Sequence, residues 1–223
     1  MRVTSLTLDT IIESATGAVE LVFVPSRPIS RRAGQGGMIF APGGGAKPFT
    51  FASDDRSDRI SIATTIHSRS RFKRALAALT PGDRLFAVGA VGSLPAVSPT
   101  ASQVLVAQGI GITPFLSLAR SQGSLNATLL HVGSPHYFDE VTAATSTATH
   151  HDHREGLIHA VSTAVAERVD ADWSLSGRSD FVSAVARQLT DAGVPGRRIH
   201  RDTFWGMRSS NAIPRTRTIP VSA

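Results

Sequence analysis

The fold of this chain is indicated by one stretch, Val104-Leu105-Val106-Ala107-Gln108-Gly109-Ile110-Gly111-Ile112-Thr113-Pro114. Its first four residues predict a short buried strand, and Pro114 suits the first turn of a helix, where no amide donor is needed. Glycines between a strand and a helix let the backbone approach a pyrophosphate, which the free N–H groups and dipole of the helix attract. We therefore expect Gly109, Gly111, Thr113 and Pro114 to bind a dinucleotide. The alternative is a turn without a ligand, which the strand–turn–helix setting disfavours.

The chain beyond this stretch alternates strands with helices. Such alternation predicts a doubly wound parallel α/β domain, which we place at residues 99–207. After the helix that Pro114 opens, the expected elements are strand Leu129–Val132, helix Leu157–Arg168, strand Trp173–Ser176, helix Asp180–Ala192 and strand Ile199–Phe204.

The first half of the chain consists of short β-prone runs separated by turn residues. One helix interrupts them, Arg71–Leu79, with Ser70 as its N-cap and Pro81-Gly82 beyond its end. Many short strands with one helix favour a six-stranded antiparallel β-barrel over residues 1–98. We expect residues 208–223 to form a flexible or docking tail. The predicted strands are Val3–Leu8, Val19–Val24, Met38–Ala41, Phe49–Ala52, Ile60–Ile66 and Arg84–Val88.

The composition excludes several kinds of chemistry. The chain has no cysteine, so thiolate catalysis, disulfides and cysteine-held iron–sulfur clusters or zinc sites are absent from it. The longest apolar stretch, Val104–Ala119, is too interrupted to span a membrane, and no secretory signal is visible at the start. We expect a cytoplasmic monomer that binds neither membranes nor nucleic acid.

The net charge of +6 is unevenly distributed. Residues 1–98 hold 12 Lys and Arg against 7 Asp and Glu, whereas residues 99–207 hold 8 against 10. A basic barrel half would attract an acidic partner protein or a phosphate-bearing cofactor, and the alternative is an ordinary solvated surface.

Two short motifs in the barrel half have the residue types that a flavin needs. In Lys47-Pro48-Phe49-Thr50 the cation can balance negative charge, the aromatic can stack on the ring, and the hydroxyl can hydrogen-bond the ring's N5. Ser68-Arg69-Ser70 stands at a helix start and adds a guanidinium for an anion. The alternatives are a plain edge strand and a simple N-cap.

Taken in order, these pieces resemble the ferredoxin–NADP reductase superfamily over residues 1–207. Thr50 is similar to the hydroxyl that ends the family's flavin motif, and the later matches follow in the family's order. They are Ser70-Arg71-Phe72-Lys73-Arg74-Ala75-Leu76 with Pro81-Gly82-Asp83, Gly89-Ala90-Val91-Gly92-Ser93, Ala107–Pro114, Ser176-Gly177-Arg178 and Asp202-Thr203-Phe204.

The resemblance implies an FAD-dependent NAD(P)H oxidoreductase. It implies that Thr50 polarises the flavin N5, that Ser176 and Asp202 hold the nicotinamide carboxamide, and that Phe204 covers the flavin. Gly177 would border the same site. FAD is favoured over FMN because the chain keeps the pyrophosphate-type helix start at Ser70. The co-substrate is NADPH or NADH, with a lean to NADPH because Ser134 and His136 could touch a 2′-phosphate.

The electron acceptor implied by the resemblance is an acidic redox protein, such as a ferredoxin or flavodoxin. Two alternatives stay open. The chain could be a free-flavin or ferric-chelate reductase, or a non-catalytic flavin-binding electron-relay subunit. Gln108, Ser176 and Arg178 depart from the family pattern and keep the relay hypothesis open.

A run of histidines, His150, His151 and His153, with His159 further on, invites a metal hypothesis. By the family resemblance this run should lie in a polar surface connection, without the fixed geometry that metal ligands need. We therefore expect no metal site.

Overall fold

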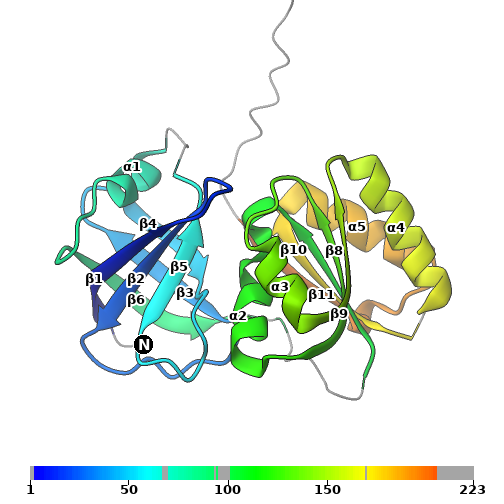
Figure 1. Ribbon diagram of the computed structural model, residues 1–223, viewed down its shortest axis with the longest axis horizontal. Helices are drawn as coiled ribbons and strands as arrows, with labels where there is room; N and C mark the ends of the chain where they lie inside the picture. Colours follow the sequence, from blue (N-terminus) through cyan, green and yellow to red (C-terminus); the bar gives the residue numbers. More distant parts are fainter. Residues whose placement is uncertain (1–2, 67–69, 93, 95–100, 169, 205–223) are drawn as a thin grey trace, which may run out of the picture.

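A computed structural model of the chain describes residues 3–66, 70–92, 94, 101–168 and 170–204. These residues form two sheets, an antiparallel one from the first half of the chain and a parallel one from the second, set side by side in Figure 1. The predicted fold class is therefore confirmed. The predicted domain boundary near residue 98 and the tail 208–223 fall outside the described residues and stay predictions. No described helix is long and apolar enough to cross a membrane.

The antiparallel sheet has six strands in the order β4-β3-β6-β1-β2-β5. Its edge strands meet at one end, because the N–H of Ala52, just beyond β4, donates to the Ser61 carbonyl of β5 at 2.8 Å. This contact curls the sheet into a barrel around the apolar side chains of its inner face. The elements are β1 Val3–Glu13, β2 Val19–Pro25, β3 Gly36–Ala41, β4 Gly45–Thr50, β5 Ile60–Thr64, α1 Arg71–Ala77 and β6 Arg84–Val91.

The second sheet has five parallel strands in the order β11-β10-β7-β8-β9. The chain moves outward from β7 to β9 and then returns to the other side of β7, so the order reverses between β7 and β10. Its elements are β7 Gln103–Gln108, the 3₁₀ turn η1 Gly109–Ile112, α2 Thr113–Gln122, β8 Leu125–Val132, α3 Phe138–Ala144, β9 Thr145–His151, α4 Arg154–Glu167, β10 Asp172–Arg178, α5 Ser179–Asp191, η2 Gly196–Arg198 and β11 Ile199–Phe204.

Each face of the parallel sheet has its own apolar core. Helices α4 and α5 cover the face away from the barrel, where Leu157 and Val182 pack around the buried Trp173. Helices α2 and α3 cover the other face, and their core also includes Ala33, Ala52 and Ala63 of the barrel half. One hydrophobic core therefore runs from the parallel sheet into the barrel, and α2 lies between the two (Figure 1).

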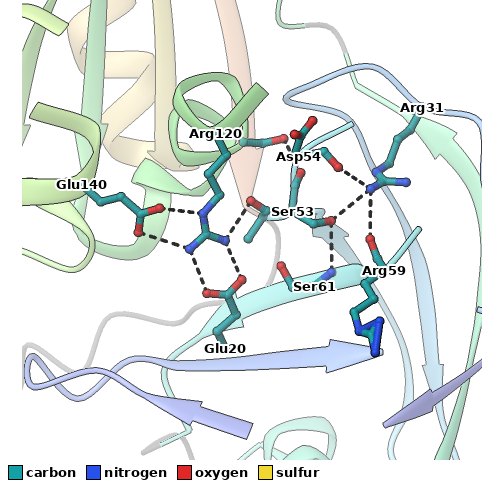
Figure 2. Close-up of polar contacts among 10 residues, drawn as sticks. Glu20, Arg31, Ser53, Asp54, Arg59, Ser61, Arg120 and Glu140 are labelled. Atoms are coloured by element: carbon teal, nitrogen blue, oxygen red, sulfur yellow. Dashed lines mark hydrogen bonds and ion pairs between the residues drawn. The ribbon is translucent and has the colours of Figure 1, made fainter. Parts of the chain in front are cut away.

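A buried ion pair crosses this interface (Figure 2). The guanidinium of Arg120 in α2 binds both carboxylate oxygens of Glu20 in β2, at 2.6 and 3.1 Å, and both of Glu140 in α3, at 2.7 and 3.2 Å. It also donates to the Ala52 carbonyl at 3.2 Å. Glu20 is only 6% exposed in its side chain, so its charge depends on Arg120 for compensation. This arginine with its two glutamates, which we call the Arg120 clamp, fixes α2 against the barrel.

The structure differs from the sequence prediction at two elements, α3 and β9. Residues 138–151 have no strong apolar periodicity, and the histidine run at their end was predicted to be a surface loop. That prediction was wrong, because His150 and His151 belong to β9 and pair with His131 and Val132 of β8. As an edge strand with no fully buried residue, β9 lacks the apolar alternation that marks a strand in sequence.

We expect Arg120→Met to lower the free energy of unfolding by about 3 kcal/mol, because it leaves the Glu20 carboxylate buried without its partner. Urea denaturation followed by circular dichroism measures this change. The matched control is Arg59→Met, which removes an ion pair with Asp9 whose side chains are 45% and 39% exposed. It should cost less than about 1 kcal/mol. Equal effects of the two substitutions would contradict the clamp.

Candidate functional site

The glycines predicted to bind a dinucleotide meet where the strand order of the parallel sheet reverses. Gly109–Ile112 follows β7, and Gly177 lies in β10, the neighbouring strand on the other side of the reversal. A Cβ at Gly111 would lie 2.8 Å from the Ser176 carbonyl oxygen and 2.9 Å from the Gly177 Cα, so only glycine fits there. Ligands of open α/β sheets bind in the crevice at such a reversal.

Thr113 and Pro114 begin α2 directly after this turn. The Thr113 hydroxyl donates to the Ile110 carbonyl at 2.6 Å, and the side chain is buried. The hydroxyl therefore closes the 3₁₀ turn from within. Pro114 occupies the first helical turn, where its missing N–H costs nothing.

A pocket of about 100 Å³ lies between the barrel and the end of β11. Pro48, Phe49 and Thr50 line it from the barrel side, and Asp202 and Thr203 line it from β11. Gly34, Gly36, Gly37 and Gly92 complete its wall. A Cβ at Gly36 would lie 2.0 Å from the Phe49 carbonyl oxygen, so glycine at this position lets β3 and β4 approach closely beside the pocket. Complete ligand pockets usually exceed about 300 Å³, so this one accepts part of a larger ligand.

Three polar side chains predicted to be catalytic converge beside this pocket. Ser176 of β10 and Asp202 of β11 are register partners on adjacent strands, and Thr50 lies across the pocket. Burial raises the pKa of the Asp202 carboxyl, and the Ser176 and Thr50 hydroxyls partly offset that effect. Among the described residues, Asp202 Oδ2 and Ser176 Oγ are buried with no hydrogen-bond partner. Buried polar atoms without partners cost free energy unless a ligand satisfies them.

The other predicted residues take different positions. Phe204 ends β11 beside Arg178, but its side chain lies outside the described part of the structure, as do Ser68 and Arg69. Ser70 caps α1 by accepting from the Lys73 N–H at 3.2 Å. His136 is not turned toward solvent, since its Nδ1 lies 2.9 Å from the Thr16 hydroxyl across the domain interface.

Phe49 and Lys47 lie beside a lysine that the sequence analysis did not single out. The Phe49 ring stacks on Phe72 of α1, with centroids 5.5 Å apart, and the Lys73 ammonium lies 5.7 Å from the Phe49 centroid. Burial, with repulsion from Lys47, lowers the pKa of Lys73 to about 8. Two like charges in close proximity form a site that an anion would stabilise. The signal for Lys73 was its place three residues after the Ser70 cap.

One buried histidine was missed altogether. His131 in β8 is fully buried, and its Nε2 lies 3.1 Å from the Gly109 carbonyl oxygen, so it touches the glycine turn directly. In sequence it is the one polar residue of the predicted strand Leu129–Val132, which is typical of a structural core position. Among the described residues there is no group of three or more potential ligands placed to hold a metal.

Comparisons with protein-family models and with curated proteins found no match. Solved structures do match. The ferredoxin reductase of carbazole 1,9a-dioxygenase has a TM-score of 0.77 at 18% identity, over 92% of this chain and 68% of that one. Phthalate dioxygenase reductase has a TM-score of 0.75 at 21% identity, over 93% and 70%. A ferredoxin NADP⁺ reductase from Neisseria gonorrhoeae with bound FAD and NADP has a TM-score of 0.73 at 18% identity, over 91% and 99%.

These likenesses show that the chain has the two-domain fold of ferredoxin reductases. It spans nearly the whole Neisseria chain. It spans 66% of the carbazole dioxygenase reductase solved in its FAD apo form, so about a third of that protein lies outside the matched part.

We expect Asp202→Asn to raise the free energy of unfolding at pH 7 and to leave it unchanged at about pH 3. The folded protein holds the Asp202 proton more tightly than the unfolded chain does, because burial raises this pKa. The contribution of Asp202 to stability is therefore complete at low pH and is lost as the pH rises through the folded pKa. Urea denaturation at both pH values measures the difference.

The matched control is Asp180→Asn. Burial acts to raise the pKa of the Asp180 carboxyl, but hydrogen bonding and attraction from Arg154 outweigh it and lower that pKa. The contribution of Asp180 to stability is therefore present at pH 7 and is lost as the pH falls. Asp180→Asn should therefore destabilise the protein at pH 7. A loss of stability from Asp202→Asn at pH 7 would show that its carboxylate is instead compensated in the folded state.

Proposed function

We propose that this chain is a flavin-dependent NAD(P)H oxidoreductase that passes electrons to an external acceptor. The observation that carries the proposal is the meeting of Thr50 from the barrel with Ser176 and Asp202 from the parallel sheet, beside a glycine-walled pocket. The glycine turn packs directly against Ser176 and Gly177, because a Cβ at Gly111 would lie 2.8 Å from the Ser176 carbonyl oxygen and 2.9 Å from the Gly177 Cα. A flavin in the pocket and a nicotinamide in the crevice would supply hydride transfer, which is chemistry of the cofactors themselves.

The chain's own residues would orient the two ring systems. Thr50 has a hydroxyl at the pocket wall to hydrogen-bond a flavin nitrogen, and Pro48 and Phe49 border the same wall. Ser176 and Asp202 have unpartnered buried oxygens, which suit the donor and acceptor groups of a carboxamide. Phe204 remains a proposed cover for the flavin.

The phosphates of an FAD would be neutralised at α1. Lys47 and Lys73 are close enough for one ammonium to depress the pKa of the other, and Ser70 caps the N-terminus of the same helix. Ser68 and Arg69 stay proposed ligands of the same group. FAD is preferred over FMN on this ground.

NADPH and NADH both remain candidate co-substrates. The lean to NADPH rested on Ser134 and His136, and His136 is buried and bonded to Thr16. Ser134 is exposed and available, but a single hydroxyl gives little discrimination between a ribose and its 2′-phosphate.

The electron acceptor is proposed to be an acidic redox protein, of the ferredoxin or flavodoxin kind. The structural match phthalate dioxygenase reductase is described as passing electrons from pyridine nucleotides to a [2Fe-2S] group. This chain has no cysteine, so within its 223 residues it lacks the thiolates to hold such a cluster. The excess of 12 Lys and Arg over 7 Asp and Glu in residues 1–98 favours attraction of an acidic acceptor.

The proposal is tested by purifying the protein and adding NADPH or NADH without oxygen. A yellow protein that either dinucleotide bleaches supports the proposed reaction.

Thr50→Val should keep the yellow colour and slow bleaching about tenfold, which is the equivalent of one lost hydrogen bond. Thr190→Val, at an exposed helix position where the hydroxyl binds only the Ala186 carbonyl, is the matched control and should not slow it. A colourless protein that oxidises NADPH only with added flavin would indicate a free-flavin reductase.

A second candidate, a flavin-binding electron relay without a co-substrate, is favoured by Gln108. This residue stands at the end of β7, directly before the glycine turn, and its Oε1 is buried without a partner among the described residues. A Cβ added to Gly177 would lie 3.0 Å from the Gln108 Cβ, so the side chain begins at the wall of the crevice.

We expect Gln108→Gly to lower the Kd for the dinucleotide about tenfold if the side chain obstructs the crevice, because it removes the obstructing atoms. Isothermal titration calorimetry with NADP⁺ and NAD⁺ measures this, and Gln122→Gly at the distant end of α2 is the control. Weaker binding in Gln108→Gly would instead make Gln108 a ligand of the dinucleotide. A yellow protein whose wild type is untouched by both dinucleotides, and whose Gln108→Gly variant is bleached, would establish the relay.

A further inference from the structure

A pair of stacked histidines lies beneath the glycine turn. His131 of β8 and His150 of β9 are register partners on adjacent strands, and their ring centroids are 5.2 Å apart. Their Nδ1 atoms face each other at 3.0 Å, and the other nitrogen of His131, Nε2, lies 3.1 Å from the Gly109 carbonyl oxygen. Phe138 of α3 packs against both rings, at 5.6 and 5.4 Å. The proposed chemistry of the site assigns no role to either histidine.

The partners of His131 determine which of its nitrogens carries the proton. A carbonyl oxygen can only accept, so Nε2 must carry the hydrogen that binds Gly109. Burial lowers the pKa of His131 to about 4, so the ring is neutral at pH 7 and its Nδ1 has a lone pair. The hydrogen between the two Nδ1 atoms therefore belongs to His150. Oδ1 of the exposed Asp152 lies 3.5 Å from His150 Nε2, beyond the usual N–H···O hydrogen-bond range, so it does not draw this hydrogen to Nε2. The Gly109 carbonyl and the His150 N–H thus select the same tautomer of His131.

This hydrogen bond also fixes the direction of a peptide group in the glycine turn. Gly109 has φ +52°, in the left-handed region that glycine adopts without steric cost. Contacts with neighbouring residues therefore decide how its peptide group is oriented. In a trans peptide the C=O and the following N–H point in opposite directions. With the Gly109 carbonyl held toward β8, the N–H of Ile110 points away from His131. Backbone N–H groups oriented outward from such a turn are the groups that bind a pyrophosphate.

We propose that His131 is a positioning residue for the dinucleotide: it holds the Gly109 carbonyl inward, in the tautomer that His150 selects, so that the turn presents its N–H groups to the ligand. The positioning role rests on the proposed function, because it requires that the turn binds a dinucleotide. The assignment of the tautomer does not rest on the proposed function, because it follows from the hydrogen bonds that His131 makes to His150 and Gly109.

The tautomer is tested by long-range ¹H–¹⁵N NMR of the purified full chain at pH 7. The His131 signals, identified by their loss in His131→Gln, should show a protonated Nε2 and a bare Nδ1. His150→Ala removes the donor to Nδ1 and leaves only the Gly109 carbonyl to favour the Nε2–H form, so it should raise the share of the Nδ1–H form above that of the wild type. His150→Asn keeps an N–H at the level of Nδ1 and should preserve the Nε2–H form. A wild-type His131 that is protonated on Nδ1 would overturn the inference, whatever the protein binds.

The positioning role is tested by a matched pair of substitutions at His131. The glutamine amide reaches the level of Nε2 and can still donate to Gly109, whereas the shorter asparagine amide ends at the level of Nδ1. His131→Asn should raise the Kd for NADP⁺ or NAD⁺, whichever the wild type binds, about tenfold by calorimetry, and His131→Gln should raise it less than about threefold. In turnover assays the same difference should be found in KM, with kcat unchanged.

Thermal unfolding separates positioning from general damage to the fold. If both variants melt at similar temperatures and only His131→Asn binds weakly, the positioning role is supported. Equal binding by both variants, or weakening in proportion to lost stability, overturns it. A wild type that binds neither dinucleotide overturns the proposed function and the positioning role together, while the NMR result still decides the tautomer.

Discussion

The contact between Arg120 and Glu20 is the constraint on which the site depends. The pocket has one wall from the barrel and another from β11, so its shape depends on how the two halves are held together, and the ion pair between α2 and β2 contributes to that. Glu20 and Arg120 are a hundred positions apart, yet the guanidinium binds the carboxylate through two oxygens and reaches a second carboxylate on α3. Although burial acts to lower the pKa of Arg120, this pairing raises it, so the charge that joins the two halves is permanent.

A second polar contact connects helix α2 to the barrel half. The Ser117 hydroxyl donates to the Ser53 carbonyl at 3.0 Å and accepts from the Gly34 N–H, which ties this helix to the loops around the pocket.

This arrangement separates two demands that a ligand site places on a protein. At the interface the Arg120 guanidinium binds both oxygens of Glu20 and of Glu140, which makes the relative position of the two sheets specific. The site next to it is polar and incompletely paired, with Asp202 Oδ2 and Ser176 Oγ buried and lacking partners among the described residues. A rigid frame can hold such unsatisfied groups in place, because the free energy of the clamp and core offsets their cost. The groups are then available to a ligand without reorganisation.

Much of the fold could be predicted from the sequence, and the physical reasons are visible in particular residues. Apolar β7 and amphipathic α5 have periodic patterns set by burial, and the prediction placed them correctly to within a few residues. The glycine turn was predictable because Gly111 has no room for a side chain, so the sequence must have glycine at that position.

Strand β9 was not predictable, because an edge strand can be polar on both faces and still pair through its backbone. Lys73 and His131 were also missed as site residues. Their roles arise from contacts with residues distant in sequence, Phe49 and Gly109, and a single sequence holds no record of such pairs.

The place of β9 at the outer edge of the sheet has a consequence for how the crevice responds to fluctuations. Edge strands with few buried side chains open more readily than central ones, on the scale of local rather than global unfolding. His150 belongs to that strand, and through His131 it reaches the carbonyl of Gly109. Fraying of the least protected strand thereby removes the donor that selects the orientation of the turn two strands away. In this molecule the order of the glycine turn is coupled to the local opening equilibrium of a polar sheet edge, and not only to the stability of the apolar core around it.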